Sequence, residues 1–179
     1  NIINSLQEAG GISNYWSELS KRMSRYDVDF YGYENSNIFN NKTSRGQERD
    51  SILPAKIARY LNFRKKLPKF SVFHSSYYRV TKQKNIVNII TVYDFTYEYY
   101  RSGLAKFIHS FQKKRAKKKS NGIICISNNT KKDLLNLYPN IKEDKVKVIY
   151  LGVSDCFKVT KEKIDVLNVN FKKLVDKKY

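Results

Sequence analysis

The hydrophobic residues of this chain fall into two kinds of segment that alternate along its length. Short, nearly continuous apolar runs are typical of strands buried on both faces, and stretches in which apolar residues recur every three or four positions are typical of amphipathic helices. The runs predict strands at residues 28–33, 70–74, 86–92, 122–126 and 146–150. The spaced segments predict helices at residues 12–23, 52–63, 99–119 and 128–138.

This alternation predicts the fold class. Strands joined by helices of this length form right-handed βαβ units, which assemble a parallel sheet covered on both faces. We therefore expect an α/β, Rossmann-like parallel sheet with helices on both faces. A length of 179 residues suits a single domain. The Asn-rich segment 34–49 is expected to be a loop, and the mixed pattern of residues 160–179 predicts no clear element.

A pair of glycines precedes the first predicted helix. Gly10 and Gly11 lead directly into the helical pattern that begins at Ile12. Adjacent glycines allow positive φ angles and a close approach of a ligand to the main chain. The unpaired N–H groups of a helix's first turn favour an anion such as a phosphate. The pair predicts either a phosphate-binding turn or an ordinary connection from loop to helix.

The composition changes this picture mainly through charge. The formal net charge is +19, which attracts polyanions such as nucleic acid, anionic lipid or pyrophosphate groups.

An aromatic content of 14% argues against a disordered chain. No apolar run is long enough for a transmembrane helix, and residues 1–5 do not resemble a signal peptide. Cys125 and Cys156 have no His partner at ligand spacing, which favours neither a zinc site nor a disulfide and indicates a reducing compartment.

Polar and aromatic residues follow the later predicted strands. In open parallel sheets, ligands bind beyond the carboxyl ends of the strands, so these residues are the candidates for chemistry. Each cluster alone could equally be a helix cap or a polar loop, and Ser127 in particular suits an N-cap. The clusters and the glycine pair together favour a sugar- and phosphate-binding edge. They comprise residues 74–79, 93–96, 127–131 and 152–153.

Taken in order, these segments resemble the N-terminal half of a GT-B glycosyltransferase of family 4. The resemblance covers about residues 1–157, and it is closest to bacterial enzymes that build O-antigen or capsular glycans on a lipid carrier. It rests on residues 5–13 (SLQEAGGIS), 73–78 (FHSSYY), 91–95 (TVYDF), 124–134 (ICISNNTKKDL) and 144–153 (DKVKVIYLGV).

The resemblance implies a two-domain enzyme that retains anomeric configuration and needs no metal ion or other cofactor. Residues 1–157 would be the acceptor-binding domain, and residues 158–179 a linker or helix toward a donor-binding domain. That second domain, with its paired glutamates, and a first strand ahead of Asn1 are missing from this sequence, so we expect the chain alone to be inactive. The implied substrates are a UDP- or GDP-linked sugar and a polyprenyl-pyrophosphate-linked glycan.

The resemblance and the strand ends together imply a set of site residues. Asp94 is the candidate for orienting or deprotonating an acceptor hydroxyl, although an aspartate here could equally cap the following helix. Tyr93 stands where the family often has His, and its phenol could still donate a hydrogen bond. The expected substrate-binding residues are Gly10, Gly11, His74, Tyr77, Tyr78, Arg79, Tyr93, Ser127 and Lys131.

The predicted helix 99–119 carries a dense basic cluster. Such a helix can lie on an anionic membrane, which a lipid-linked acceptor would require. The expected location is then cytoplasmic and peripheral, on the inner face of the cell membrane. In the alternative, the apolar stripe packs on the sheet and the lysines form a solvated face. The stripe comprises Leu104, Phe107, Ile108 and Phe111, and the cluster comprises Lys113, Lys114, Arg115, Lys117, Lys118 and Lys119.

Two other function classes stay open. The charge and the abundant aromatics suit a nucleic-acid-binding module, but no RRM signature, zinc-finger spacing or KH-type loop is present, and nucleic acid is not an expected partner. The chain could also be a half-domain that binds a glycan lipid without turnover.

Overall fold

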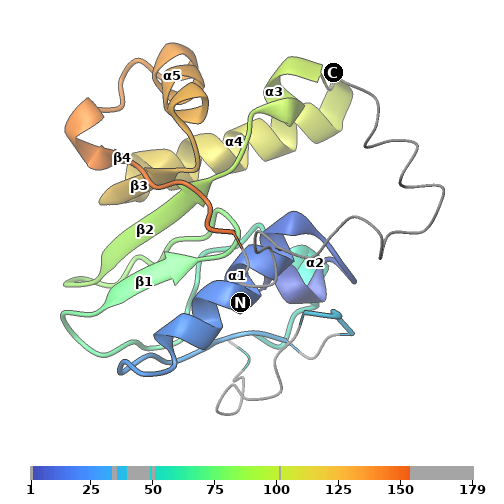
Figure 1. Ribbon diagram of the computed structural model, residues 1–179, viewed down its shortest axis with the longest axis vertical. Helices are drawn as coiled ribbons and strands as arrows, with labels where there is room; N and C mark the ends of the chain where they lie inside the picture. The colour runs from blue at the N-terminus through green and yellow to red at the C-terminus, as the bar shows by residue number, and fades with distance from the viewer. Residues whose placement is uncertain (1, 34–35, 40–48, 50, 101, 154–179) are drawn as a thin grey trace, which may run out of the picture.

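Figure 1 shows the computed structural model, which describes residues 2–33, 36–39, 49, 51–100 and 102–153; in helix α4 the side chains at 104–106, 108 and 109 are not described. The strands are β1 (Val72–Ser75), β2 (Val87–Val92), β3 (Gly122–Cys125) and β4 (Val146–Val148). The α-helices are α1 (Gly11–Met23), α2 (Ala55–Ala58), α3 (Thr96–Tyr100), α4 (Gly103–Lys119) and α5 (Asn128–Leu137). Two short 3₁₀ helices are η1 (Ile3–Ser5) and η2 (Glu143–Lys145).

The four strands form one parallel sheet in the order β1-β2-β3-β4. Helices α3 and α4 lie between β2 and β3 in the chain, and α5 lies between β3 and β4. These helical connections let consecutive strands run in the same direction. The prediction of an α/β, Rossmann-like fold is confirmed.

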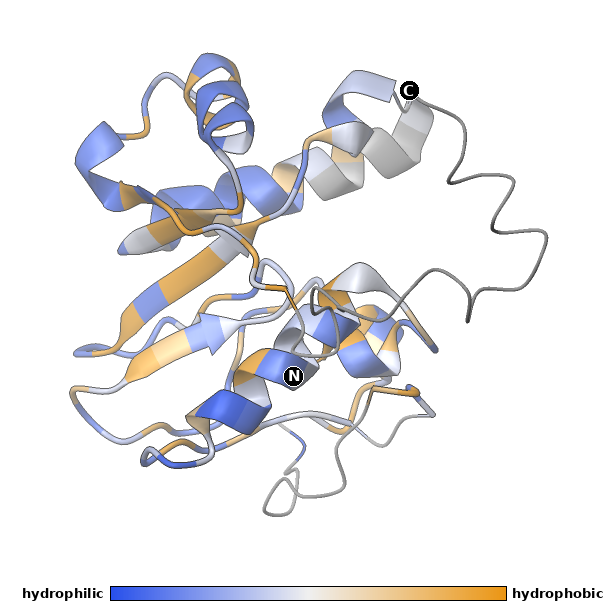
Figure 2. Cartoon of the chain, viewed as in Figure 1, coloured by the Kyte–Doolittle hydropathy of each residue, from blue (hydrophilic) through white to orange (hydrophobic). Residues whose placement is uncertain are grey.

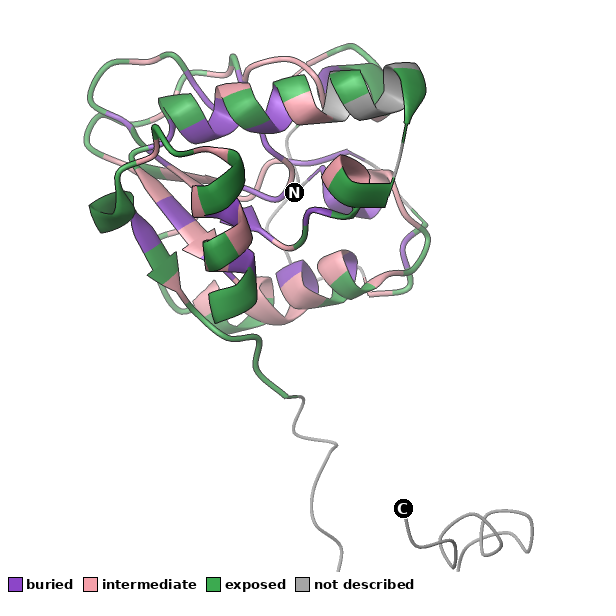
Figure 3. Cartoon of the chain, turned by 90° about the horizontal axis from the view of Figure 1, so that it is seen from above, coloured by how far each residue is buried: buried purple, intermediate pink, exposed green. Residues whose placement is uncertain are grey.

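Helices cover both faces of the sheet, and Figure 3 shows α4 and α1 on opposite sides of it. On the opposite face from α1, the main buried cluster joins Ala116 of α4 and Leu134 of α5 to the strand residues Ile90, Val92, Ile123 and Cys125. Figure 2 shows hydrophobic residues concentrated along β1 and β2. Burial of these side chains from water, at about 25 cal/mol per Å² of apolar surface, drives the assembly of this layer.

Residues 28–33 do not form the predicted strand; a single bridge residue, Tyr31, is all that the segment contributes to pairing. Aromatic packing holds the segment instead. The Tyr31 ring lies 5.1 Å from that of Phe63 in an edge-to-face arrangement. Tyr33 is buried in a second, smaller cluster with Ile2 and Ala58. The alternating apolar residues therefore reflect packing against another loop rather than a place in the sheet.

The predicted helix 52–63 forms only over α2, with Pro54 at its N-cap. Side chains from distant parts of the chain bind the carbonyl groups that a longer helix would need. Gln112 donates to the Arg59 carbonyl, and the carbonyls of Tyr60 and Leu61 accept hydrogen bonds from Arg115 (2.9 Å) and Arg79 (3.1 Å) respectively. Phe63 N–H donates to Val80 O rather than back into a helix. The helix ends because these competing partners satisfy the backbone.

The predicted helix 99–119 is divided into α3 and α4. The described part of its apolar stripe does not pack on the sheet as the second alternative predicts, and two of the lysines expected at a membrane are buried. The apolar residues Phe107 and Phe111 of α4 are exposed, whereas Lys113 and Lys117 are buried against the core. Lys114, Lys118 and Lys119 are exposed, and Arg115 is half-buried. The basic cluster therefore does not form one solvated face. The side chains of Leu104 and Ile108 lie outside those described.

Several sequence predictions fall outside the described residues. Cys156, the segment 158–179 and most of the predicted loop 34–49 are among them. Within the described part of the chain, no helix combines the length and the apolar character needed to cross a bilayer.

Candidate functional site

Aromatic side chains from α1 and from the ends of β1 and β2 meet on one face of the sheet. The indole N–H of Trp16 donates to the Tyr93 hydroxyl at 2.6 Å, and the Trp16 ring lies 4.6 Å from His74, edge to face. The Tyr15 ring contacts those of Trp16 and Tyr93, at centroid distances of 5.7 and 6.0 Å. Two adjacent residues of α1 therefore connect His74, near the end of β1, with Tyr93, which follows β2.

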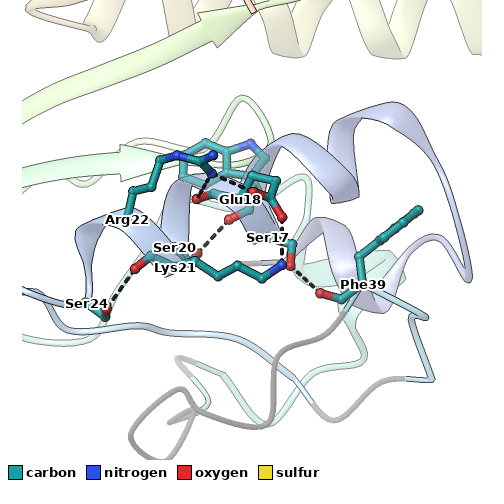
Figure 4. Close-up of polar contacts among 8 residues, drawn as sticks. Ser17, Glu18, Ser20, Lys21, Arg22, Ser24 and Phe39 are labelled. Atoms are coloured by element: carbon teal, nitrogen blue, oxygen red, sulfur yellow. Dashed lines mark hydrogen bonds and ion pairs between the residues drawn. The ribbon is translucent and has the colours of Figure 1, made fainter. Parts of the chain in front are cut away.

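Figure 4 shows how α1 is held with this face toward the sheet. On its other side, Ser17 donates to the carbonyl of Phe39, which ties the helix to residues 36–39. Glu18 forms exposed ion pairs with Lys21 (2.6 Å) and Arg22 (2.5 Å), one helical turn away. Such exposed pairs add little stability, so the buried contacts set the position of α1.

His74 is a neutral residue at the floor of this cluster. Its Nε2 lies 2.9 Å from Thr91 Oγ1 on the neighbouring strand. Burial lowers the pKa of His74 to about 4, because desolvation disfavours the imidazolium. At neutral pH the ring can therefore accept or donate one hydrogen bond, but it carries no charge.

The turn after β2 brings Tyr93 and Asp94 together with the start of α5. Asp94 is exposed, and one carboxylate oxygen accepts a hydrogen bond from Thr96 N–H at 3.0 Å, so it caps α3. Thr130 of α5 donates its hydroxyl to the Tyr93 carbonyl at 3.3 Å. Ser127 is the N-cap of α5, and its Oγ accepts from Thr130 N–H at 3.1 Å. A capping role is thus confirmed for both Asp94 and Ser127.

Gly10 and Gly11 do not adopt the positive φ angles that we expected. Gly10 is extended, with φ 169°, and the one described glycine with φ in the left-handed region is Gly103. Position 10 favours glycine for a different reason, because a Cβ there would lie 2.6 Å from Gln7 Oε1. The N-cap residue of α1 is Gly10, which has no side chain to cap the first-turn N–H groups, and such groups can bind an anion.

Four of the expected substrate-binding residues are engaged elsewhere. Tyr78 is buried in the main cluster on the α4 face. Arg79 is buried and donates to Leu61 O at 3.1 Å, and the Tyr77 ring packs under Arg59 at 4.0 Å. The ammonium of Lys131 forms an ion pair with Glu143 at 2.6 Å. Tyr78 and Arg79 contribute to packing rather than to the aromatic cluster.

Three residues of the cluster were not predicted as site residues, namely Tyr15, Trp16 and Thr91. Trp16 is the single tryptophan of the chain and lies next to Tyr15 on the helix that follows the glycine pair. That placement is a signal that sequence reasoning could have used. Thr91 lies two residues beyond Ile89, the residue paired with His74, and its approach to His74 depends on this strand register, which the sequence does not display.

Two further kinds of chemistry would require a reactive cysteine or a metal site among the described residues. Burial raises the pKa of the Cys125 thiol to about 11, so this cysteine is an inert core residue at neutral pH. Among the described residues, no three His, Cys, Asp or Glu side chains lie together as a metal-binding group.

Comparison with known proteins identifies the family. The family model described as Glycosyltransferase Family 4 matches residues 9–155, which is most of the chain and includes the whole aromatic cluster. No curated protein matches the sequence significantly. The parallel sheet with helices on both faces agrees with one half of a GT-B glycosyltransferase. The chain therefore contains a glycosyltransferase domain and belongs to Glycosyltransferase Family 4.

Proposed function

We propose that this chain is the acceptor-binding half of a retaining glycosyltransferase that takes a sugar from a UDP- or GDP-linked donor. The proposed acceptor is a polyprenyl-pyrophosphate-linked glycan in the synthesis of a surface polysaccharide such as O-antigen or capsule. Family membership supports a nucleotide sugar and a glycan as the substrate classes. The observation that carries the assignment of this half is the exposed Asp94 beside the aromatic cluster at the carboxyl ends of the strands.

In this proposal Asp94 orients or deprotonates the acceptor hydroxyl. Its Oδ1 accepts a hydrogen bond from Thr96 N–H, and its second carboxylate oxygen has no hydrogen-bond partner among the described residues. That oxygen can accept a hydrogen bond from a sugar hydroxyl. The Tyr93 phenol can donate a hydrogen bond to a bound sugar while it accepts one from Trp16. Aromatic rings also suit the apolar faces of sugar rings, which Tyr15 and Trp16 would contact.

The start of α1, which the N-cap Gly10 does not cap with a side chain, would act on the donor. The first-turn N–H groups and the helix dipole favour the negative charge that develops on a departing nucleoside diphosphate, and they require no metal ion. Gly11 would let the diphosphate approach the main chain closely, because open space lies where its side chain would be, whereas the Gln7 amide occupies that space at Gly10.

The test is a transfer assay on the intact protein with a panel of UDP- and GDP-linked sugars and a polyprenyl-pyrophosphate-linked glycan. We expect the acceptor to gain the mass of one sugar residue with one of these donors. Asp94→Asn should lower kcat about 100-fold or more, as expected for loss of a general base. Asn caps a helix as well as Asp does, so the substitution removes the charge and keeps the turn.

Asp144→Asn is the matched control, because Asp144 is an exposed aspartate in η2. It should transfer sugar at the wild-type rate. Absence of transfer by the wild-type protein with every donor would contradict the proposed function. Wild-type turnover in Asp94→Asn would remove Asp94 from the mechanism and leave the rest in place.

We further propose that the outer face of α4 lies on an anionic membrane, where a lipid-linked acceptor is found. The side chains of Phe107 and Phe111 are 69% and 59% exposed, and their rings stack at a centroid distance of 6.5 Å. Lys114 and Lys118 continue the same helical face, and Lys119 follows. Exposed phenylalanines beside lysines suit the boundary between lipid headgroups and acyl chains, and each lysine adds about 1 kcal/mol near an anionic surface.

Co-sedimentation with vesicles of phosphatidylcholine and an anionic phospholipid tests this surface. The triple variant Lys114→Gln, Lys118→Gln, Lys119→Gln should lose most of its binding, and Phe107→Ser with Phe111→Ser should weaken it independently. The control replaces Lys66, Lys69 and Lys147, which are exposed on other elements, by Gln. Equal loss of binding in the control would indicate a diffuse charge effect and exclude a specific membrane-facing surface.

A further inference from the structure

The turn that carries Tyr93 and Asp94 receives a hydrogen bond from helix α4 on the face of the sheet opposite α1. Lys113 of α4 donates from Nζ to the Asp94 carbonyl at 3.1 Å. Other contacts to this turn come from α1, α3 and α5, and Tyr78 forms a hydrogen bond with the Tyr93 backbone. Lys113 is therefore the link between α4 and the main chain of the candidate catalytic residue.

The ammonium of Lys113 is buried together with its counterion. Nζ lies 3.0 Å from Glu98 Oε2, and the two side chains are only 5% and 7% exposed. The rings of Tyr78 and Phe95 each lie 5.4 Å from Nζ. Aromatic faces attract a cation at this range, so the position of Nζ is fixed from several directions.

Stability alone does not account for this buried pair. Taking two charges out of water costs about as much as their attraction returns, and well-packed apolar residues are often equally stable in their place. Here the balance is poorer still, because Glu98 Oε1 is buried without a hydrogen-bond partner among the described residues. The distinctive contribution of the pair is its hydrogen bond to Asp94 O, which an apolar side chain cannot make.

We propose that Lys113 is a positioning residue for the turn at Tyr93 and Asp94, and that Glu98 holds Lys113 in place. By fixing the Asp94 carbonyl, Lys113 sets the direction in which the carboxylate of Asp94 faces the acceptor hydroxyl. The inference rests on the proposed function, because the direction of the carboxylate matters to catalysis only if Asp94 contacts the acceptor. Helix α4 would then stabilise the turn through Lys113 on its inner face and expose Phe107 and Phe111 on its outer face.

The test replaces both charges at once, as Glu98→Met with Lys113→Met. Removal of the whole pair takes away one charge of each sign. The buried Lys117 then loses the attraction of Glu98 and the repulsion of Lys113 together, and because burial already lowers its pKa to about 7, it can shed its proton. The variant should therefore fold with a thermal midpoint close to that of the wild type. Should it not fold, Lys113→Met with Glu98→Gln takes its place. The control is Lys114→Met, one position further along α4, where the lysine is exposed.

Two readouts separate positioning from a merely structural role. In the intact protein, kcat should fall about 100-fold because the reacting groups are misplaced, while the KM for the nucleotide sugar stays unchanged. In the 179-residue chain, the single tryptophan Trp16 reports on the turn through its bond to Tyr93. Its emission should shift to longer wavelength, and acrylamide should quench it faster. Lys114→Met should leave kcat, emission and quenching as in the wild type.

The two readouts also separate this inference from the proposed function. If the wild-type protein transfers sugar, a folded double variant with wild-type kcat overturns the positioning role. If the wild-type protein transfers none, the proposed function fails by itself, and the emission of Trp16 then decides. Unchanged emission and quenching in the folded double variant would overturn the role of Lys113 in holding the turn.

Discussion

Tyr93 contacts neighbouring elements through three parts of its structure. Its ring meets the edge of Tyr15, its hydroxyl accepts the Trp16 N–H, and its carbonyl accepts the Thr130 hydroxyl. Burial raises the pKa of its phenol well above the ordinary value for tyrosine, so the hydroxyl keeps its proton at neutral pH. Tyr93 can therefore donate a hydrogen bond to a ligand, as the family's histidine would, without carrying a charge at any physiological pH.

The low pKa of His74 predicts a pH dependence of stability. The folded protein takes up a proton at His74 only near pH 4, whereas the unfolded chain does so near pH 6.5. Between these values the unfolded state binds more protons, so the free energy of unfolding falls as pH falls, by up to about 1.4 kcal/mol per pH unit from this group. His74→Gln, whose amide can still reach Thr91, should lose this part of the slope. Urea denaturation at intervals from pH 4 to pH 7 measures it.

The comparison between variant and wild type cancels the contributions of the carboxyl groups, which titrate alike in both proteins. The two denaturation curves should diverge only in the window from pH 6.5 down to about 4. Parallel pH profiles across that window would show that His74 becomes protonated in the folded state as easily as in the unfolded chain.

At the scale of the element, the start of α5 couples helix stability to the candidate site. Ser127 Oγ accepts from Thr130 N–H at 3.1 Å, and Thr130 in turn reaches the turn after β2. Ser127→Ala should therefore lower the free energy of unfolding by about 1 kcal/mol, the usual cost of losing a helix cap. Urea denaturation at pH 7 provides the measurement.

Ser102 offers a matched control for the cap of α5. It is the N-cap residue of α4, but its side chain makes no capping hydrogen bond. Ser102→Ala should change the free energy of unfolding by less than about 0.5 kcal/mol, as expected for a surface substitution. Equal losses from the two substitutions would mean that the Ser127 hydroxyl adds nothing beyond intrinsic preference for the N-cap position.

The elements differ in how far local sequence determines them. The strands β1 to β4 follow from apolar runs because a parallel sheet buries both of its faces. Helix α2 is shorter than the hydrophobic pattern predicts, because the side chains of Gln112, Arg115 and Arg79 donate hydrogen bonds to the carbonyl groups that follow it. No local pattern contains that information, because these partners lie 18 to 55 positions away in the chain.

The orientation of α4 shows the same limit at the candidate site. One of the two interpretations of the hydrophobic periodicity places Phe107 and Phe111 in the core and the lysines in solvent, whereas the structure exposes the phenylalanines and buries Lys113 and Lys117. Lys117 Nζ lies 3.4 Å from the centroid of the Tyr138 ring and 4.8 Å from that of Phe95. Aromatic rings and Glu98 accommodate these ammonium groups inside the fold. Contacts of this kind depend on tertiary structure, which explains why the strand ends were predictable and the supporting lysines were not.

At the scale of the whole molecule, the positive charge acts at two ranges. The net charge of +19 attracts any polyanion over a distance of about one Debye length, which is near 8 Å at physiological salt. Lys114, Lys118 and Lys119 add a local effect only where they are combined with exposed Phe107 and Phe111. A nucleic acid would sense the first effect, whereas a membrane would sense both.

This difference predicts how the chain binds DNA. The logarithm of the affinity should fall steeply and linearly with the logarithm of salt concentration, without sequence preference, and little binding should remain at 200 mM salt. The Lys114, Lys118, Lys119 variant and the Lys66, Lys69, Lys147 control each remove three positive charges, so both should weaken DNA binding equally. Fluorescence anisotropy with labelled duplexes of unrelated sequence measures this. Binding that prefers one sequence and persists at 200 mM salt would instead indicate a nucleic-acid-binding module, because only contacts beyond net charge survive such screening.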